Sequence, residues 1–180
     1  MHPLLDQYLC KKYPKIFADR NKSPMESCMH WGLAVNNGWF YLIDALCDRI
    51  QQHIDQHNEC VDEGYEWAVK EGKIPQVVAL QVKEKFSGLR FYYSGGDKYI
   101  EGVVSMAEDF SYRICEECGR MDETIGRNQK GWIVTTCEDH RRNKNDFHRN
   151  GDEELDKIWK KVHKDEEKEQ QRIQATSAQV

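Results

Sequence analysis

The sequence lacks long hydrophobic runs, and no segment approaches the about eighteen consecutive apolar residues typical of a membrane-spanning helix. The opening residues, MHPLLDQYLCKKYPK, also lack the apolar centre of a secretion signal. Positively charged residues are fewer than negatively charged ones: the sequence has 26 Lys and Arg and 31 Asp and Glu, which gives a net charge of -5. We therefore expect a cytoplasmic protein without a membrane partner, in which nucleic-acid binding would need a local basic patch.

Cysteine usage does not match a secreted disulfide framework. The 180 residues contain seven cysteines, an odd number, whereas paired cysteines favour an even one. Cys10, Cys28, Cys47 and Cys60 are scattered, and the other three lie within 115–137. This clustering indicates a metal site formed by reduced cysteines.

Two short motifs supply four candidate metal ligands. Cys115 and Cys118 form a Cys-x2-Cys pair that Gly119 follows, and Cys137 and His140 form a Cys-x2-His pair eighteen residues further on. This spacing is typical of structural zinc. A catalytic zinc keeps one coordination position for water, whereas four protein ligands complete a tetrahedron. We therefore predict a structural Zn²⁺ at these four residues.

The residues between the two pairs suggest how the site is built. Gly119 permits a tight turn after the first pair, and residues 130–136, KGWIVTT, are β-branched and aromatic, which favours a strand. Thr135 or Thr136 could cap a helix that starts at the second pair. Knuckle, hairpin and helix together predict a treble-clef-like zinc finger over residues 115–148.

Hydrophobic periodicity predicts an α+β fold for the rest of the chain, with helices packed on a small antiparallel hairpin. We expect a core domain over 1–114, the zinc finger over 115–148, and a charged C-terminal helix and tail over 149–180. The expected elements are a helix from Leu4 that Pro14 ends, helices over 38–57 and 95–114, and strands over 76–86 and 89–93.

The hairpin predicts a charged face. With Ser87-Gly88 as its two-residue turn, Phe86 faces Leu89 and packs on the helices. Lys83, Lys85, Arg90 and Tyr92 then share the opposite face, with Lys85 opposite Arg90 and Lys83 opposite Tyr92. Facing like charges destabilise a sheet, so this face indicates an anionic partner: a phosphate, a nucleotide, a nucleic-acid backbone or an acidic protein surface. Neutralisation by nearby glutamates, or simple solvation of the lysines, is the alternative.

Two weaker candidate sites have simpler interpretations. His53 and His57 have the i, i+4 spacing that can hold a metal, but they continue an apolar stripe and are more typical of a core border. Cys28 and His30 could pair as thiol and base. However, alternate residues of an extended chain point to opposite faces, which favours packing.

Several sequence blocks resemble a group of small, mostly uncharacterised proteins encoded by tailed bacteriophages and prophages. The resemblance covers roughly residues 13–140 and implies a cytoplasmic phage accessory protein with a zinc knuckle, without implying any catalytic residue. The blocks are YPKIF, SPMESCMHWGL, GWFYLIDALCDRIQ, PQVVALQVKEKFSGLRFYYSGGDKYI, YRICEECG and GWIVTTCEDH.

Three functions remain open at this point. The first, favoured by the closed ligand set and the resemblance, is a non-enzymatic protein that binds a host or phage macromolecule, such as an inhibitor of a host defence system. The second is a nucleic-acid or nucleotide binder that uses the basic hairpin face. The third is an enzyme that depends on the metal or on Cys28. The charged helix at 149–180 could also support a homodimer.

Overall fold

The computed structural model describes residues 1–128, 130–141, 148–149, 157, 161 and 164. The residues up to His148 belong to one compact unit, and a second unit begins at Arg149. Most of the predicted charged helix and tail at 149–180 lies outside the described residues, as do residues 142–147 of the predicted zinc finger. The proposed dimer contact through that helix stays a prediction.

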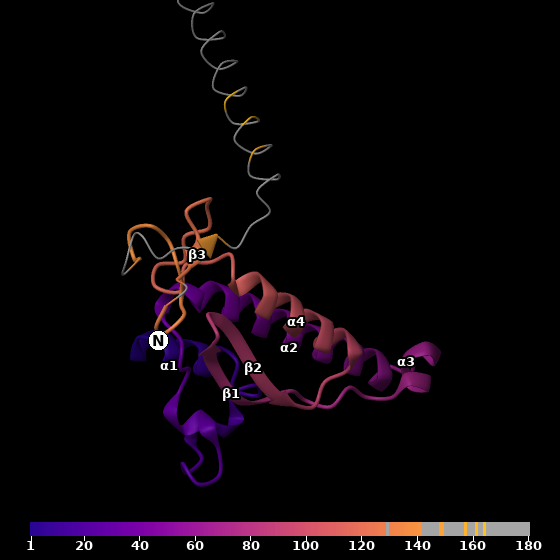
Figure 1. Ribbon diagram of the computed structural model, residues 1–180. Coiled ribbons are helices and arrows are strands. Elements are labelled where there is room, and N and C mark those ends of the chain that lie inside the picture. The colour runs from indigo at the N-terminus through magenta and orange to yellow at the C-terminus, as the bar shows by residue number, and fades with distance from the viewer. Residues whose placement is uncertain (129, 142–147, 150–156, 158–160, 162–163, 165–180) are drawn as a thin grey trace, which may run out of the picture. The chain divides into compact units, whose positions relative to one another are not determined.

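The described part of the chain is α+β, as predicted, with four α-helices and a two-stranded antiparallel hairpin at its centre (Figure 1). Short 3-10 helices, η1 to η3, join α1 to α2, and the remaining strands are two residues long. The elements are α1 (Pro3–Lys12), η1 (Ala18–Asn21), η2 (Cys28–Trp31), η3 (Asn37–Trp39), α2 (Phe40–Asp62), α3 (Glu66–Glu71), β1 (Val78–Lys85), β2 (Gly88–Ser94), α4 (Lys98–Ser111), β3 (Gly126–Arg127), β4 (Thr135–Thr136) and β5 (His148–Arg149).

The long helices form where local signals and apolar spacing agree. Asp97 caps the start of α4, since its carboxylate accepts the Ile100 N–H at 3.0 Å. In α2 the apolar side chains recur every three or four residues and are buried, so this helix has one core-facing side. The short helix α3 was not predicted, because its six residues are too few to show a helical period.

The core lies between the hairpin and the helices α2 and α4, which run side by side in Figure 1. Trp39, Ile43, Ile50, Val82 and Leu89 are fully or almost fully buried there. Two aromatic side chains of the helices lie outside this core, because Tyr8 of α1 and Phe110 of α4 are both exposed. On α4 the buried side consists of Ile100, Val104, Ala107 and Ser111, which recur every three or four residues.

The predicted hairpin register is wrong by two residues. Phe86 and Ser87 form the turn, with φ angles of 54° and 66°, and Lys85 faces Gly88 while Lys83 faces Arg90. A two-residue hairpin turn needs positive φ at both positions, which normally selects Asn and Gly. Gly88 has a different role, because a Cβ there would lie 2.5 Å from the Tyr112 ring.

A shift of two residues leaves the two faces of each strand unchanged, because side chains alternate with a period of two. Lys83 and Arg90 therefore still share one face, and Val82 and Phe91 the other. Phe86 is the exception, since it occupies the turn and its exposed fraction is 68%. The predicted packing of Phe86 on the helices is wrong.

The outer edge of β1 is partly covered by the segment before η3. Ala34 forms a parallel bridge with Lys83, in which the Ala34 N–H donates to the Val82 carbonyl at 2.9 Å. The Glu84 N–H donates to the Ala34 carbonyl at 3.0 Å. Residues 34–39 thus lie between the hairpin and the cysteine segment that follows α4.

Candidate metal centre

The first ligand pair lies on a tight turn just after α4. The Cys115 N–H donates to the Arg120 carbonyl at 2.9 Å, and the Gly119 N–H donates to the Cys115 carbonyl at 2.8 Å. Gly119 has a φ of 81°, which lies in the left-handed region that favours glycine. This knuckle turns the chain back on itself and brings both thiols of the pair to one side.

The second ligand pair follows β4, which pairs antiparallel with β3. The Thr135 carbonyl accepts the Glu116 N–H at 3.0 Å, so β4 is bonded to the knuckle directly. The His140 N–H donates to the Cys137 carbonyl at 3.2 Å and closes a turn that brings the imidazole back toward the thiols.

The helix of the predicted treble clef is not observed among the described residues. Residues 138–140 form a turn, and Arg141 has no regular structure. The predicted capping role of the threonines is wrong, because both lie within β4. The Thr135 hydroxyl donates to the Ser87 carbonyl at 2.8 Å and so ties β4 to the hairpin turn.

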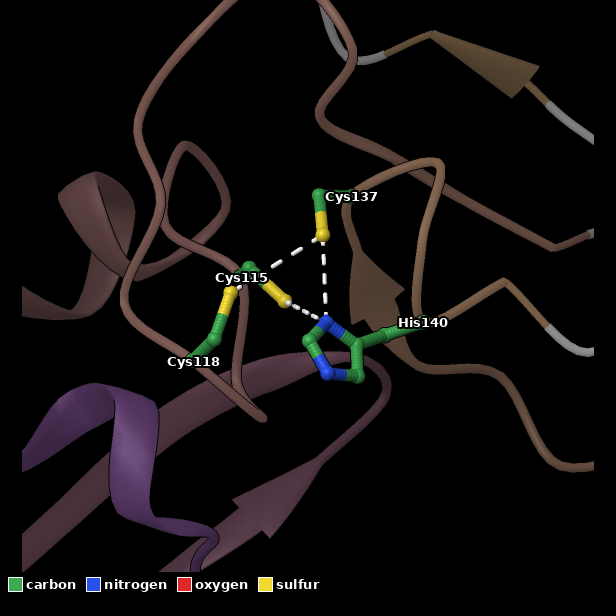
Figure 2. Close-up of side chains that lie close together, drawn as sticks. All are labelled: Cys115, Cys118, Cys137 and His140. Carbon is green, nitrogen blue, oxygen red and sulfur yellow. Dashed lines mark hydrogen bonds between the residues drawn. The ribbon is translucent and has the colours of Figure 1, made fainter.

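The four predicted ligands lie together and point toward one another (Figure 2), with their ligand atoms within 4.8 Å of one another. The sulfurs of Cys118 and Cys137 are 3.8 Å apart, and His140 Nδ1 lies 3.2 Å from the Cys137 sulfur and 3.7 Å from that of Cys115. A tetrahedral zinc with Zn–S of about 2.3 Å and Zn–N of about 2.0–2.1 Å separates two sulfurs by about 3.8 Å and sulfur from nitrogen by about 3.6 Å. The arrangement is therefore compatible with a metal site.

Burial and polarity at the site also suit a cation. Cys115 and Cys137 are buried, whereas Cys118 and His140 lie at the surface. Burial raises the pKa of the Cys115 thiol to about 11, so its ionisation at neutral pH needs a nearby positive charge. Burial acts in the same direction on Cys137, but hydrogen bonds from His140 and from backbone N–H groups outweigh it and lower the pKa of Cys137 to about 7.

The knuckle is fixed to the core through η3, a contact that sequence patterns did not predict. The Gly38 N–H donates to the Glu116 carbonyl at 2.7 Å, and the buried indole of Trp39 donates to the Ile114 carbonyl at 3.2 Å. A Cβ at Gly38 would lie 2.1 Å from the Cys115 carbonyl oxygen and 2.5 Å from the Gly119 nitrogen. Only glycine permits this approach of the two backbones.

The predicted basic face is divided between paired and unpaired cations. Arg90 donates to the Tyr112 hydroxyl at 2.9 Å and lies 3.8 Å from the Glu108 carboxylate, which matches the neutralisation alternative. Lys83 and Lys85 form no ion pair with any described residue. The Lys83 ammonium lies 5.4 Å from the centre of the Tyr92 ring, which is partly exposed. Anion binding by the four residues together stays a prediction.

The two weaker candidate pairs have separate partners. His53 Nε2 lies 2.8 Å from an Asp97 carboxylate oxygen, and His57 Nε2 lies 2.8 Å from the Gly72 carbonyl oxygen. The His30 Nδ1 lies 2.8 Å from the Lys22 carbonyl oxygen, which leaves a pairing with Cys28 untested. Within the described ranges, the Cys115 group is the one cluster of three or more metal-ligating side chains.

No protein-family model matches the sequence, and neither a curated protein nor a solved structure matches it. The resemblance to phage proteins therefore stays an expectation. In the part of the chain that the structure describes, every helix is too short or too polar to cross a membrane.

Proposed function

We propose that this chain is a zinc-stabilised binding protein, in which one Zn²⁺ has a structural role and the surface around it recognises a macromolecule. The observation that carries the metal assignment is the convergence of three thiols and one imidazole within 4.8 Å. Such a donor set is typical of Zn²⁺, whereas Ca²⁺ and Mg²⁺ prefer oxygen ligands.

A structural role for the metal follows from the number of ligands. Four protein donors complete the tetrahedral coordination that Zn²⁺ adopts in structural sites, so a metal held by all four has no position for a reacting water. The metal would instead hold the knuckle against β4, and through Gly38 against the core. Binding would contribute on the order of 10 kcal/mol to the folding of this segment.

The partner class rests on the resemblance described above, and we propose a host or phage protein, including components of host defence systems. Unpaired Lys83 and Lys85, together with exposed Phe86, supply a surface beside the metal segment that could make such a contact. Nucleic acid is the second candidate, supported by the same lysines and Tyr92. The ion pair of Arg90 and the net charge of -5 weaken that candidate.

Native mass spectrometry tests the metal assignment, with one Zn²⁺ per chain expected before chelation and none after. Substitution with Co²⁺ then tests the structural role, because a four-ligand thiolate site gives a tetrahedral visible spectrum that added azide or cyanide does not change. A spectrum that shifts with either anion would show an open coordination position and would favour catalysis. Cys28→Ser is the control, because Cys28 is an exposed cysteine outside the cluster.

A further inference from the structure

A groove lies between the hairpin turn and the loop that precedes β4. Its volume is about 500 Å³, and it is lined by one strand end and one loop. The lining residues are Lys83, Glu84, Lys85, Phe86, Gly131, Trp132 and Ile133.

Two aromatic side chains give the groove its apolar character. Phe86 and Trp132 have exposed fractions of 68% and 71%, which is unusual for residues of this size. The Trp132 indole N–H donates to the Glu84 carboxylate at 3.1 Å, and the same carboxylate accepts the Ser87 N–H at 2.6 Å. Trp132 is therefore held in place, and the charge of Glu84 is directed toward the protein.

Phe86 is exposed at a backbone position that disfavours it. Its φ of 54° lies in the left-handed region, where a bulky side chain is rare and costs about 1–2 kcal/mol. Neither burial nor local geometry accounts for an aromatic residue here. Strained residues of this kind concentrate at binding sites, so the strain points to a role in contact with a partner.

Two lysines, Lys83 and Lys85, give the groove a positive charge beside its apolar lining. The ammonium groups of Lys83 and Lys85 lie 5.4 Å and 5.3 Å from the ring centres of Tyr92 and Phe86. Neither lysine has an ion-pair partner among the described residues. An apolar partner group in the groove would therefore lie next to two positive charges.

We propose that this groove binds an acidic peptide segment of a partner protein, with one large apolar side chain between Phe86 and Trp132 and flanking carboxylates against Lys83 and Lys85. The inference rests on the proposed binding function and specifies its surface. A peptide fits better than nucleic acid, because the lining of the groove is mostly apolar and suits an apolar side chain rather than a phosphate chain. Aromatic anchors that fill a pocket are typical of peptide recognition sites.

Selection from a random peptide library on the full chain tests the proposal. We expect enriched peptides that combine an aromatic or large aliphatic residue with Asp or Glu. Their affinity should fall about 30-fold in Trp132→Ala and at least about tenfold in Lys83→Glu/Lys85→Glu, as expected when an anchor or a charge pair is lost. Trp31→Ala and Lys70→Glu are the matched controls, because they remove an exposed tryptophan and an exposed lysine elsewhere.

The outcomes separate this proposal from the metal assignment. Zinc content is measured for each variant, and the double lysine variant decides the result if Trp132→Ala loses metal. The proposal that the groove binds an acidic peptide would be refuted by any of three results. These are failure to enrich any peptide, enrichment of basic or neutral peptides, and equal peptide affinity of the groove variants and the wild type. Binding of a twelve-residue oligothymidylate that depends on the same lysines would assign the groove to nucleic acid instead. In each of these cases, a zinc content of one ion per chain would still support the assignment of the metal site.

Discussion

Replacing Gly38 by alanine should loosen the metal segment although Gly38 is not a ligand. The φ of Gly38 does not lie in the left-handed region, so alanine can adopt its backbone conformation. The added Cβ would lie 2.1 Å, 2.5 Å and 2.6 Å from the Cys115 oxygen, the Gly119 nitrogen and the Glu116 oxygen. All three are backbone atoms of the knuckle, so the knuckle itself has to move away.

The cost has two parts. Overpacking a close contact destabilises by about 1–3 kcal/mol. Displacement of the knuckle also breaks the bond from the Gly38 N–H to the Glu116 carbonyl, which contributes about 1 kcal/mol. We expect Gly38→Ala to lower the free energy of unfolding by about 2–4 kcal/mol, a large share of the about 5–15 kcal/mol typical of a domain.

The assay combines urea denaturation with competitive zinc titration, since displacement of the knuckle should weaken both stability and metal affinity. Gly102→Ala is the control, because Gly102 lies within α4 and, apart from the adjacent residues and the helix's own backbone, nothing lies within 4 Å of its added Cβ. That change should stabilise the protein by up to about 1 kcal/mol through helix propensity. Wild-type stability and zinc affinity in Gly38→Ala would refute the reasoning.

Three further predictions concern the ligands, the cap of α4 and the hairpin turn. Loss of a residue that only supports a metal ligand typically weakens metal affinity by about 10–100-fold. Cys118→Ser removes a ligand itself and should weaken zinc affinity by more than this, whereas Cys28→Ser should leave zinc affinity unchanged in the same titration. Partial burial of Asp97 raises its pKa, but hydrogen bonds from His53 and the α4 backbone outweigh this effect and lower the pKa below 3.8. The ionised Asp97 therefore stabilises the folded protein above pH 3.8, and this contribution is lost as the pH falls through the pKa of the folded state. Asp97→Ala should therefore cost about 1 kcal/mol in urea denaturation at pH 7, and the difference from wild type should narrow below about pH 4; a constant difference would contradict this. Phe86→Asn should raise the unfolding free energy by about 1 kcal/mol, because asparagine tolerates positive φ, and should weaken peptide binding at the groove; lower stability would contradict the strain argument.

The elements that sequence patterns predicted well are those with many concordant local signals. The helix α2 repeats its apolar side every three or four residues from Ile43 to Ile54, and α4 begins at a capping aspartate. The hairpin register was mispredicted because Ser87-Gly88 is the better turn sequence by local preference. Tertiary contacts override that preference, since Gly88 packs against Tyr112 and the Thr135 hydroxyl binds the Ser87 carbonyl.

The ligand set was predictable because metal coordination fixes both residue type and spacing, and Cys115, Cys118, Cys137 and His140 do lie together. Its attachment to the core was not predictable, because the decisive residue is Gly38 and the contact spans about eighty positions of the chain. The groove was missed for a similar reason. Phe86 was expected to be buried, and Trp132 was treated only as part of a strand.

The close approach at Gly38 also limits how this metal segment could be reused. Many zinc fingers can be cut out and joined to other proteins because their ligands and their small core lie in one continuous stretch. Here the backbone beside Cys115 packs against Gly38 and accepts a hydrogen bond from the Trp39 indole, and both residues lie far earlier in the chain. A peptide of residues 112–141 made alone would lack these contacts, so we expect that this segment cannot be transferred to another protein as an independently folding zinc finger.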